Sequence, residues 1–120
     1  MEREDYIVVW NKSDICIKKV MRQTGLNNAE MIKEAKKIAA KEIGCNFVDG
    51  LNFTIGKKCF GGIYCDELAA MTKKHYCNLK MSNRELEVYG PVVIINEKGS
   101  LESYECEEIK QYIVDNMTIK

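Results

Sequence analysis

The segment Tyr-Gly-Pro-Val-Val-Ile-Ile-Asn at residues 89–96 decides the fold of this 120-residue chain. It contains four consecutive β-branched residues, at 92–95, and the only proline of the chain. Such a run is typical of a strand that is covered on both faces. Pro91 fits at its entry, because the first residue of a strand need not donate a hydrogen bond to a neighbour. We therefore expect residues 92–95 to form a central strand on which the other elements pack.

A hairpin and a long helix are predicted before this strand. Residues 6–10 and 15–20 have the pattern of two strands, and turn-forming residues separate them. Asn27 and Glu30 have the spacing of a capping box, and Gly44 is a typical helix stop. Apolar residues recur at helical spacing between the cap and the stop: Met31, Ile32, Ala35, Ile38, Ala39 and Ile43.

The middle of the chain alternates in the manner of strands. Apolar residues occupy most odd positions of residues 45–55, and Asp49-Gly50 interrupts this pattern as either a hairpin turn or a bulge. Residues 61–66 are predicted to form the next strand.

The remaining segments have weaker patterns. Residues 67–76 have the composition of a short helix, and residues 78–87 are polar enough to predict a loop. Ser103 is expected to cap a final helix over residues 103–116. The predicted fold is one α+β domain: a mixed or antiparallel sheet of about five strands, with an N-terminal hairpin, one long amphipathic helix and a C-terminal helix.

Composition excludes several classes of function. The chain has 18 basic and 18 acidic residues, so it lacks the positive charge that attracts nucleic acid, and we do not expect direct DNA binding. No apolar run approaches the length of a membrane helix, so no membrane partner is expected. Residues 1–5 are too acidic for a signal peptide, and a cytoplasmic protein is expected. Its six cysteines then favour free buried thiols over three disulfides.

Four of the possible metal ligands lie close together in the sequence. Zinc prefers four nitrogen or sulfur ligands, and the only histidine lies among three cysteines. The set is Cys59, Cys65, His75 and Cys77. No pair among them has the two-residue gap of a zinc knuckle, so we favour separate thiols and no cofactor, with zinc as the alternative.

The candidate binding site lies within residues 64–89, the least periodic part of the chain. Loops on a rigid scaffold often carry recognition, and this segment combines aromatic, acidic, amide and guanidinium groups. The candidate residues are Tyr64, Asp66, Glu67, Asn83, Arg84 and Tyr89. Arg84 is the strongest of them, because a guanidinium binds a phosphate or carboxylate through two hydrogen bonds. The alternative is that Arg84 only pairs with Glu85 or Glu87 at the surface.

The order of these parts resembles a family of small uncharacterised proteins of bacteriophages and Gram-positive mobile elements, sometimes found beside antirestriction domains. The resemblance rests on four features: a strand that ends in Asp66-Glu67, the pair Asn83-Arg84, the segment 89–95 and the acidic start of helix 103–116. The chain departs from the family at residues 67–70, where Glu-Leu-Ala-Ala replaces a Glu-Gly turn. The resemblance implies an accessory protein that acts in the bacterial cytoplasm, and it supplies no catalytic residues.

Three functions follow as hypotheses. The leading one is a non-catalytic counter-defence protein that binds and sequesters a host protein or a small nucleotide signal. The alternative is a zinc- or thiol-dependent regulator that uses the four residues at 59, 65, 75 and 77. An enzyme built on Asp66, Glu67 and Arg84 is the least favoured. A homo-oligomer is also expected, because strand 6–10 has no internal charge to protect an open sheet edge.

Overall fold

Residues 92–95 form the central strand of the fold, as their β-branched run predicts. The computed structural model describes residues 1–82 and 84–119. Its elements in chain order are β1 (Glu2–Asn11), β2 (Asp14–Gln23), α1 (Asn28–Ile43), β3 (Val48–Ile55), β4 (Lys58–Asp66), α2 (Ala69–Thr72), β5 (Cys77–Lys80), β6 (Glu85–Val88), β7 (Val92–Ile95), α3 (Ser103–Asn116) and β8 (Met117–Ile119). Within the described residues, no helix is long and apolar enough to cross a membrane.

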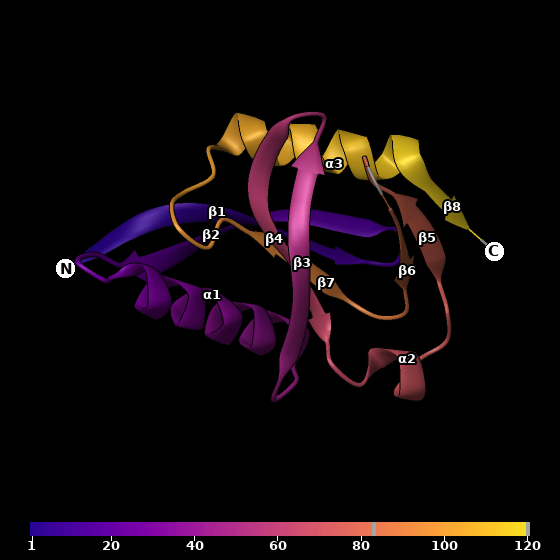
Figure 1. The fold of residues 1–120 in the computed structure, drawn as a ribbon, viewed down its shortest axis with the longest axis horizontal. Coiled ribbons are helices and arrows are strands. Elements are labelled where there is room, and N and C mark those ends of the chain that lie inside the picture. Colours follow the sequence, from indigo (N-terminus) through magenta and orange to yellow (C-terminus); the bar gives the residue numbers. More distant parts are fainter. Residues whose placement is uncertain (83, 120) are drawn as a thin grey trace.

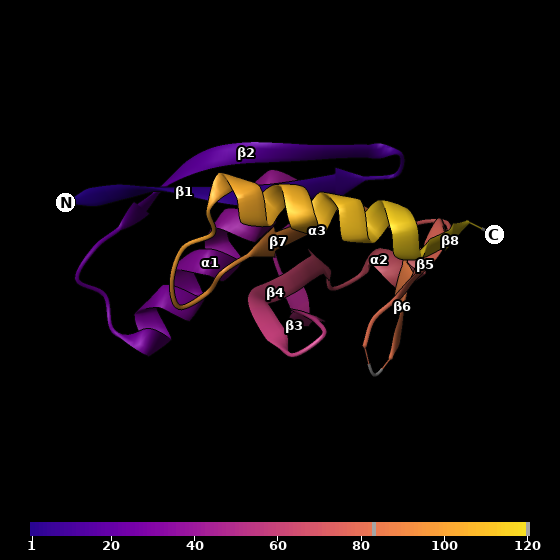
Figure 2. The ribbon, with the colours of Figure 1, turned by 90° about the horizontal axis from the view of Figure 1, so that it is seen from above.

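The strands form two antiparallel sheets. The larger sheet has the order β2-β1-β7-β4-β3, and the smaller one has the order β6-β5-β8. Helix α1 covers one face of the larger sheet and α3 covers the other (Figure 1). The smaller sheet lies beyond one end of the larger, beside α2 (Figure 2). This arrangement, with its N-terminal hairpin β1–β2, confirms the predicted α+β class.

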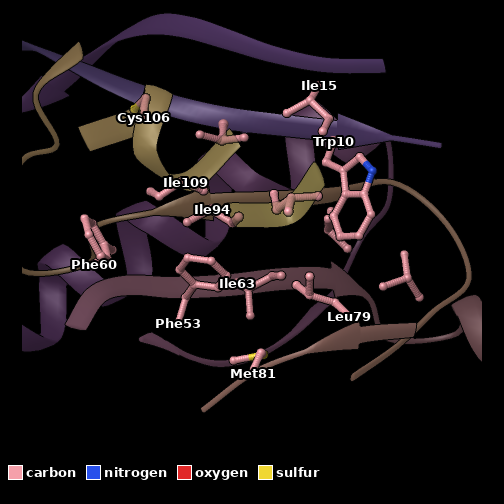
Figure 3. Packing of buried hydrophobic residues seen from close by; sticks show 14 of the residues in the cluster. Trp10, Ile15, Phe53, Phe60, Ile63, Leu79, Met81, Ile94, Cys106 and Ile109 are labelled. Carbon is pink, nitrogen blue, oxygen red and sulfur yellow. The ribbon is translucent and has the colours of Figure 1, made fainter. Parts of the chain in front are cut away.

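The two faces of β7 belong to two hydrophobic cores. Val93 and Ile95 pack toward α1, in the same cluster as Ala35 and Ala39. Val92 and Ile94 pack toward α3, in a larger cluster that also contains Trp10, Phe53, Ile63 and Ile109 (Figure 3). All four residues of β7 are buried, so the prediction that both faces of this strand are covered is confirmed.

The helix caps agree in part with the sequence. Asn27 and Glu30 form the predicted capping box of α1, and Gly44 ends it in the left-handed conformation at φ 84°. The cap of α3 was predicted at Ser103, but it is Glu102, whose N–H donates to the Glu105 carboxylate at 2.9 Å. Ser103 is instead the first residue of that helix.

Two local predictions are wrong. Residues 78–87 were predicted to be a loop, but most of them belong to β5 and β6, an antiparallel pair. Asp49-Gly50 is neither a turn nor a bulge, because β3 continues through it and the irregularity lies between Phe53 and Thr54. Gly50 is required for a different reason: a Cβ there would lie 2.4 Å from Cε1 of Tyr64.

The open edges of the larger sheet are β2 and β3. Strand β1 was expected to be such an edge, but it pairs with β2 on one side and β7 on the other. The edge strand β2 carries the exposed Lys18 and Lys19, and charged side chains protect edges against pairing. The homo-oligomer therefore stays a prediction, but an exposed edge at residues 6–10 no longer supports it, because β1 is paired on both sides.

A buried ion pair fixes the chain after β7. The side chains of Arg22 and Asp5 are both 0% exposed, and an Arg22 nitrogen lies 2.9 Å from Oδ2 of Asp5. Arg22 also donates to the carboxylate of Glu34 at 2.9 Å and to the carbonyl of Gly99 at 3.1 Å. The other oxygen of Asp5 accepts the N–H of Leu101 at 2.8 Å. This network joins the β1–β2 hairpin to the turn that leads into α3.

Candidate functional site

A groove is lined by residues of β3, β4 and β7 of the larger sheet and of β6 of the smaller one. Its volume is about 480 Å³, within the range of ligand-binding cavities. The floor is mostly aliphatic, and strands β3, β4, β6 and β7 supply it. The aliphatic residues of the floor are Leu51, Ile63, Leu86, Val88 and Val92.

Strand alternation explains how these side chains reach one floor. Leu51 and Ile63 are cross-strand partners, and both face the α3 side of the sheet. In β6 the sequence Glu-Leu-Glu-Val alternates, so that Leu86 and Val88 pack against the same cluster while Glu85 and Glu87 are exposed. The groove is therefore the open end of the α3-side core.

The rim of the groove is acidic. The carboxylates that line it are those of Asp49, Asp66, Glu67, Glu85 and Glu87. Among the described residues, no lysine or arginine lines the groove, and none of these five carboxylates is in an ion pair. Two of them accept local hydrogen bonds, Glu87 from the Tyr89 hydroxyl at 2.8 Å and Asp66 from the Leu68 N–H at 3.0 Å. The groove thus combines an apolar floor with uncompensated negative charge.

Four of the predicted binding residues line this groove: Tyr64, Asp66, Glu67 and Tyr89. Tyr64 is only 3% exposed, and its hydroxyl donates to Glu97. Burial, followed by this hydrogen bond, raises the pKa of Tyr64 above its ordinary value. Tyr89 is half-buried, and its ring packs against His75 in a T-shaped arrangement at a centroid distance of 5.2 Å. Tyr64 therefore packs with the α1-side cluster and also lines a second cavity, whereas Tyr89 reaches the surface.

Arg84 lies on a different cavity from Asp66 and Glu67. Its exposed side chain lines a polar hollow of about 570 Å³ on the α1 side of β3, together with Lys36 and Glu97. No ion pair between described residues includes Arg84, so the predicted surface pairing is not seen among them. Asn83, the other predicted residue of this pair, lies outside the described residues.

The structure does not bring the four candidate metal ligands together. Cys59 and Cys65 lie six residues apart on β4, which is about 20 Å along a strand. The Cys77 thiol is buried, and His75 Nε2 lies 2.6 Å from Oδ1 of Asn78. Among the described residues, no group of three or more His, Cys, Asp or Glu side chains is placed to hold a metal ion.

The cysteines are free thiols in different environments. Cys77 and Cys106 are buried, Cys45 and Cys65 are half-buried, and Cys16 and Cys59 are exposed. The expectation of buried thiols therefore holds for only part of the set.

Residues 85–88 of the groove lie within the predicted segment 64–89 but were not among the named candidates, and Asp49 and Leu51 lie outside that segment. The alternating Glu-Leu-Glu-Val at residues 85–88 is the signal that could have revealed them. This segment is only four residues long, and the polar composition around it favoured a loop.

Compared with known proteins, the chain matches no family model, no curated protein and no solved structure. Its function must therefore be inferred from its own residues.

Proposed function

We propose that this protein is a non-catalytic accessory protein of a bacteriophage or mobile element that binds and sequesters a bacterial host protein. The observation that carries the proposal is the groove, with its apolar floor and five carboxylates that have no ion-pair partner among the described residues. The counter-defence setting rests on the resemblance of the chain to small proteins of bacteriophages and mobile elements.

The charge of the groove favours a protein over a nucleotide signal. A phosphate that entered would meet only carboxylates among the charged groups that line the groove, and like charges in a cleft repel. A polypeptide with lysine or arginine beside apolar residues meets complementary charge and covers the aliphatic floor. Burial of apolar area contributes about 25 cal/mol per Å², so the floor supplies affinity and the rim supplies selectivity.

The thiol in the groove favours binding over nucleophilic chemistry. Burial, followed by the carboxylates of Asp49 and Asp66, raises the pKa of Cys65. A reactive cysteine needs the opposite shift, because the thiolate is the nucleophile. The groove therefore suppresses the reactive form of its own cysteine.

The proposal is tested by quantitative mass spectrometry of host proteins bound to three tagged versions expressed in bacteria. The versions are wild type, Glu85→Lys/Glu87→Lys in the groove, and Glu107→Lys/Glu108→Lys on the exposed face of α3 as a control with the same change of charge. We expect a host protein that is retained by wild type and control and lost by about tenfold or more from the groove variant.

Two results would overturn this proposal. One is a set of bound proteins that does not differ between the groove variant and the control. The other is a phosphorylated small molecule released by denaturing wild type and absent from the groove variant, which would make the ligand a nucleotide.

A further inference from the structure

We infer that copies of this chain assemble head to tail, with the basic outer face of α1 in one copy against the acidic outer face of α3 in the next. This inference goes beyond the proposed function, because neither helix lines the groove. Helix α1 covers one face of the larger sheet and α3 covers the other, so their outer faces point in opposite directions (Figure 1).

The outer face of α1 is basic. Lys33, Lys37 and Lys41 recur every four residues and Lys36 lies beside them, so these exposed side chains share the side of the helix that is turned away from the sheet. Among the described residues, none of these lysines is in an ion pair. Their positive charge is therefore available to a partner.

Most carboxylates near these lysines are already engaged. Glu34 and Glu42 are in ion pairs with side chains of β2. Glu30 accepts the N–H of Asn27 at 3.0 Å in the capping box. The acidic residues of α1 therefore stabilise the fold, and the lysines of its outer face stay uncompensated.

An apolar hollow lies beside the same lysines. Its volume is about 790 Å³, and Lys33, Lys36 and Lys37 line it together with apolar groups. The apolar residues of the hollow are Leu26, Ala40, Phe47 and Val48. The side chain of Phe47 is 71% exposed, and an aromatic side chain beside an apolar hollow is a typical anchor of a protein interface.

The outer face of α3 has the opposite charge. Its exposed acidic residues are Glu107, Glu108 and Asp115. They lie on the side of the helix opposite the buried stripe, and none of them is in an ion pair between described residues. Two lysines lie beside this face: Lys58 is paired with Glu105 at 2.8 Å, and Lys110 is half-buried.

The two charged faces match in length. Lys33 and Lys41 are eight residues apart, as are Glu107 and Asp115, which is about 12 Å along a helix in both cases. In an antiparallel contact, Lys41 lies opposite Glu107 and Lys33 lies opposite Asp115. The helix dipoles also favour this orientation, because the positive end of each helix is then beside the negative end of the other.

The same orientation brings aromatic side chains together. Tyr104 is 68% exposed and lies one turn before Glu107, while Phe47 follows the C-terminal end of α1. An antiparallel contact places both at the same end of the interface. Exposed ion pairs are individually weak, so we expect assembly to depend on protein concentration. Because the outer faces point in opposite directions, each copy contacts two neighbours and assembly continues beyond a dimer.

Sedimentation equilibrium at low salt, from micromolar to millimolar protein, tests this inference with charge reversals on each face. The α1 variant is Lys33→Glu/Lys37→Glu, and the α3 variant is Glu107→Lys/Glu108→Lys. We expect wild type to exceed the mass of two chains and each variant to stay monomeric, because like charges then face each other. In about 1 M salt, where the screening length is about 3 Å, wild type should dissociate.

Two samples show whether the lost contact is the one proposed. An equimolar mixture of the α1 and α3 variants should assemble again, since each reversed face meets one of opposite charge. The quadruple variant that combines both sets has the net charge of wild type, so it should assemble alone without any effect of net charge. The control is Glu85→Lys/Glu87→Lys, which changes the charge as the α3 variant does and should assemble like wild type.

Several results would overturn the inference. They are wild type that stays monomeric at millimolar concentration, α1 and α3 variants that assemble like wild type, and a mixture that stays monomeric. Loss of assembly from Glu85→Lys/Glu87→Lys alone would place the contact in the groove instead. Binding of short duplex DNA to wild type but not to the α1 variant would make nucleic acid the occupant of the basic face.

These outcomes are separate from those of the proposed function. Both helix variants keep the groove intact, so retention of a host protein is read independently of assembly. Wild type that assembles as expected but retains no host protein would leave the inference standing and reject the proposed function. Monomeric wild type that loses its host protein only on Glu85→Lys/Glu87→Lys would do the reverse.

Discussion

Replacing Arg22 with methionine should destabilise the protein severely. Arg22 and Asp5 are both fully buried, so Arg22→Met leaves the Asp5 carboxylate in the core without its positive partner. Breaking a buried pair in this way costs about 3–5 kcal/mol, and the carbonyl of Gly99 also loses a donor. A domain of this size is stable by only about 5–15 kcal/mol, so the loss is a large fraction of the total.

Urea unfolding followed by circular dichroism measures this effect. We expect a lower midpoint with an unchanged slope, which reports a change in stability alone. Lys18→Met is the control on the same strand: Lys18 pairs with Glu42 at 2.7 Å but is about half exposed, and such a pair contributes about 0–1 kcal/mol. Arg22→Met/Asp5→Asn should recover part of the loss, because no uncompensated charge remains in the core. A loss below about 1 kcal/mol for Arg22→Met would refute the reasoning.

Three further predictions follow from local contacts. Gly50→Ala should cost about 1–3 kcal/mol in urea unfolding, since its Cβ would lie 2.4 Å from the Tyr64 ring; an unchanged midpoint would show that the ring moves freely. At neutral pH a disulfide reagent should modify exposed Cys59 well before buried Cys77 and Cys106, as site-resolved mass spectrometry would show; equal rates would contradict the packing. Burial raises the pKa of Cys77 to about 11 from an ordinary 9.0. The contribution of the neutral thiol to stability is therefore complete below pH 9.0 and is lost as the pH rises toward 11. Cys77→Ala should flatten the fall in stability over this pH range, and an unchanged slope would argue against the shift.

The central strand and the long helix could be predicted because their signals are local. Residues 92–95 are β-branched without interruption, and Asn27, Glu30 and Gly44 mark the ends of α1 through contacts within one turn. Such signals depend on neighbours in sequence, and the fold keeps them.

The groove could be predicted only in part, because its parts come together through tertiary contacts. Asp66 and Glu67 were identified at a strand end, but Asp49 joins them through pairing of β3 with β4, which the sequence does not specify. Asp49-Gly50 was interpreted as a turn or a bulge from its local sequence, whereas the reason for the glycine is the ring of Tyr64, fourteen residues later. Arg84 was grouped with Asp66 by proximity in sequence, and the structure places it on another cavity.

The central claim is that an acidic, apolar groove selects a basic segment, and calorimetric titration with charged peptides tests it most directly. We expect the peptide Lys-Val-Lys-Val-Lys-Val-Lys to bind wild type and the Glu107→Lys/Glu108→Lys control, with a Kd that rises with salt as screening weakens the attraction. The same peptide should bind the Glu85→Lys/Glu87→Lys variant at least about tenfold more weakly. The matching peptide with glutamate in place of lysine should not bind wild type. Equal affinity of wild type for the two peptides, independent of salt, would contradict the claim.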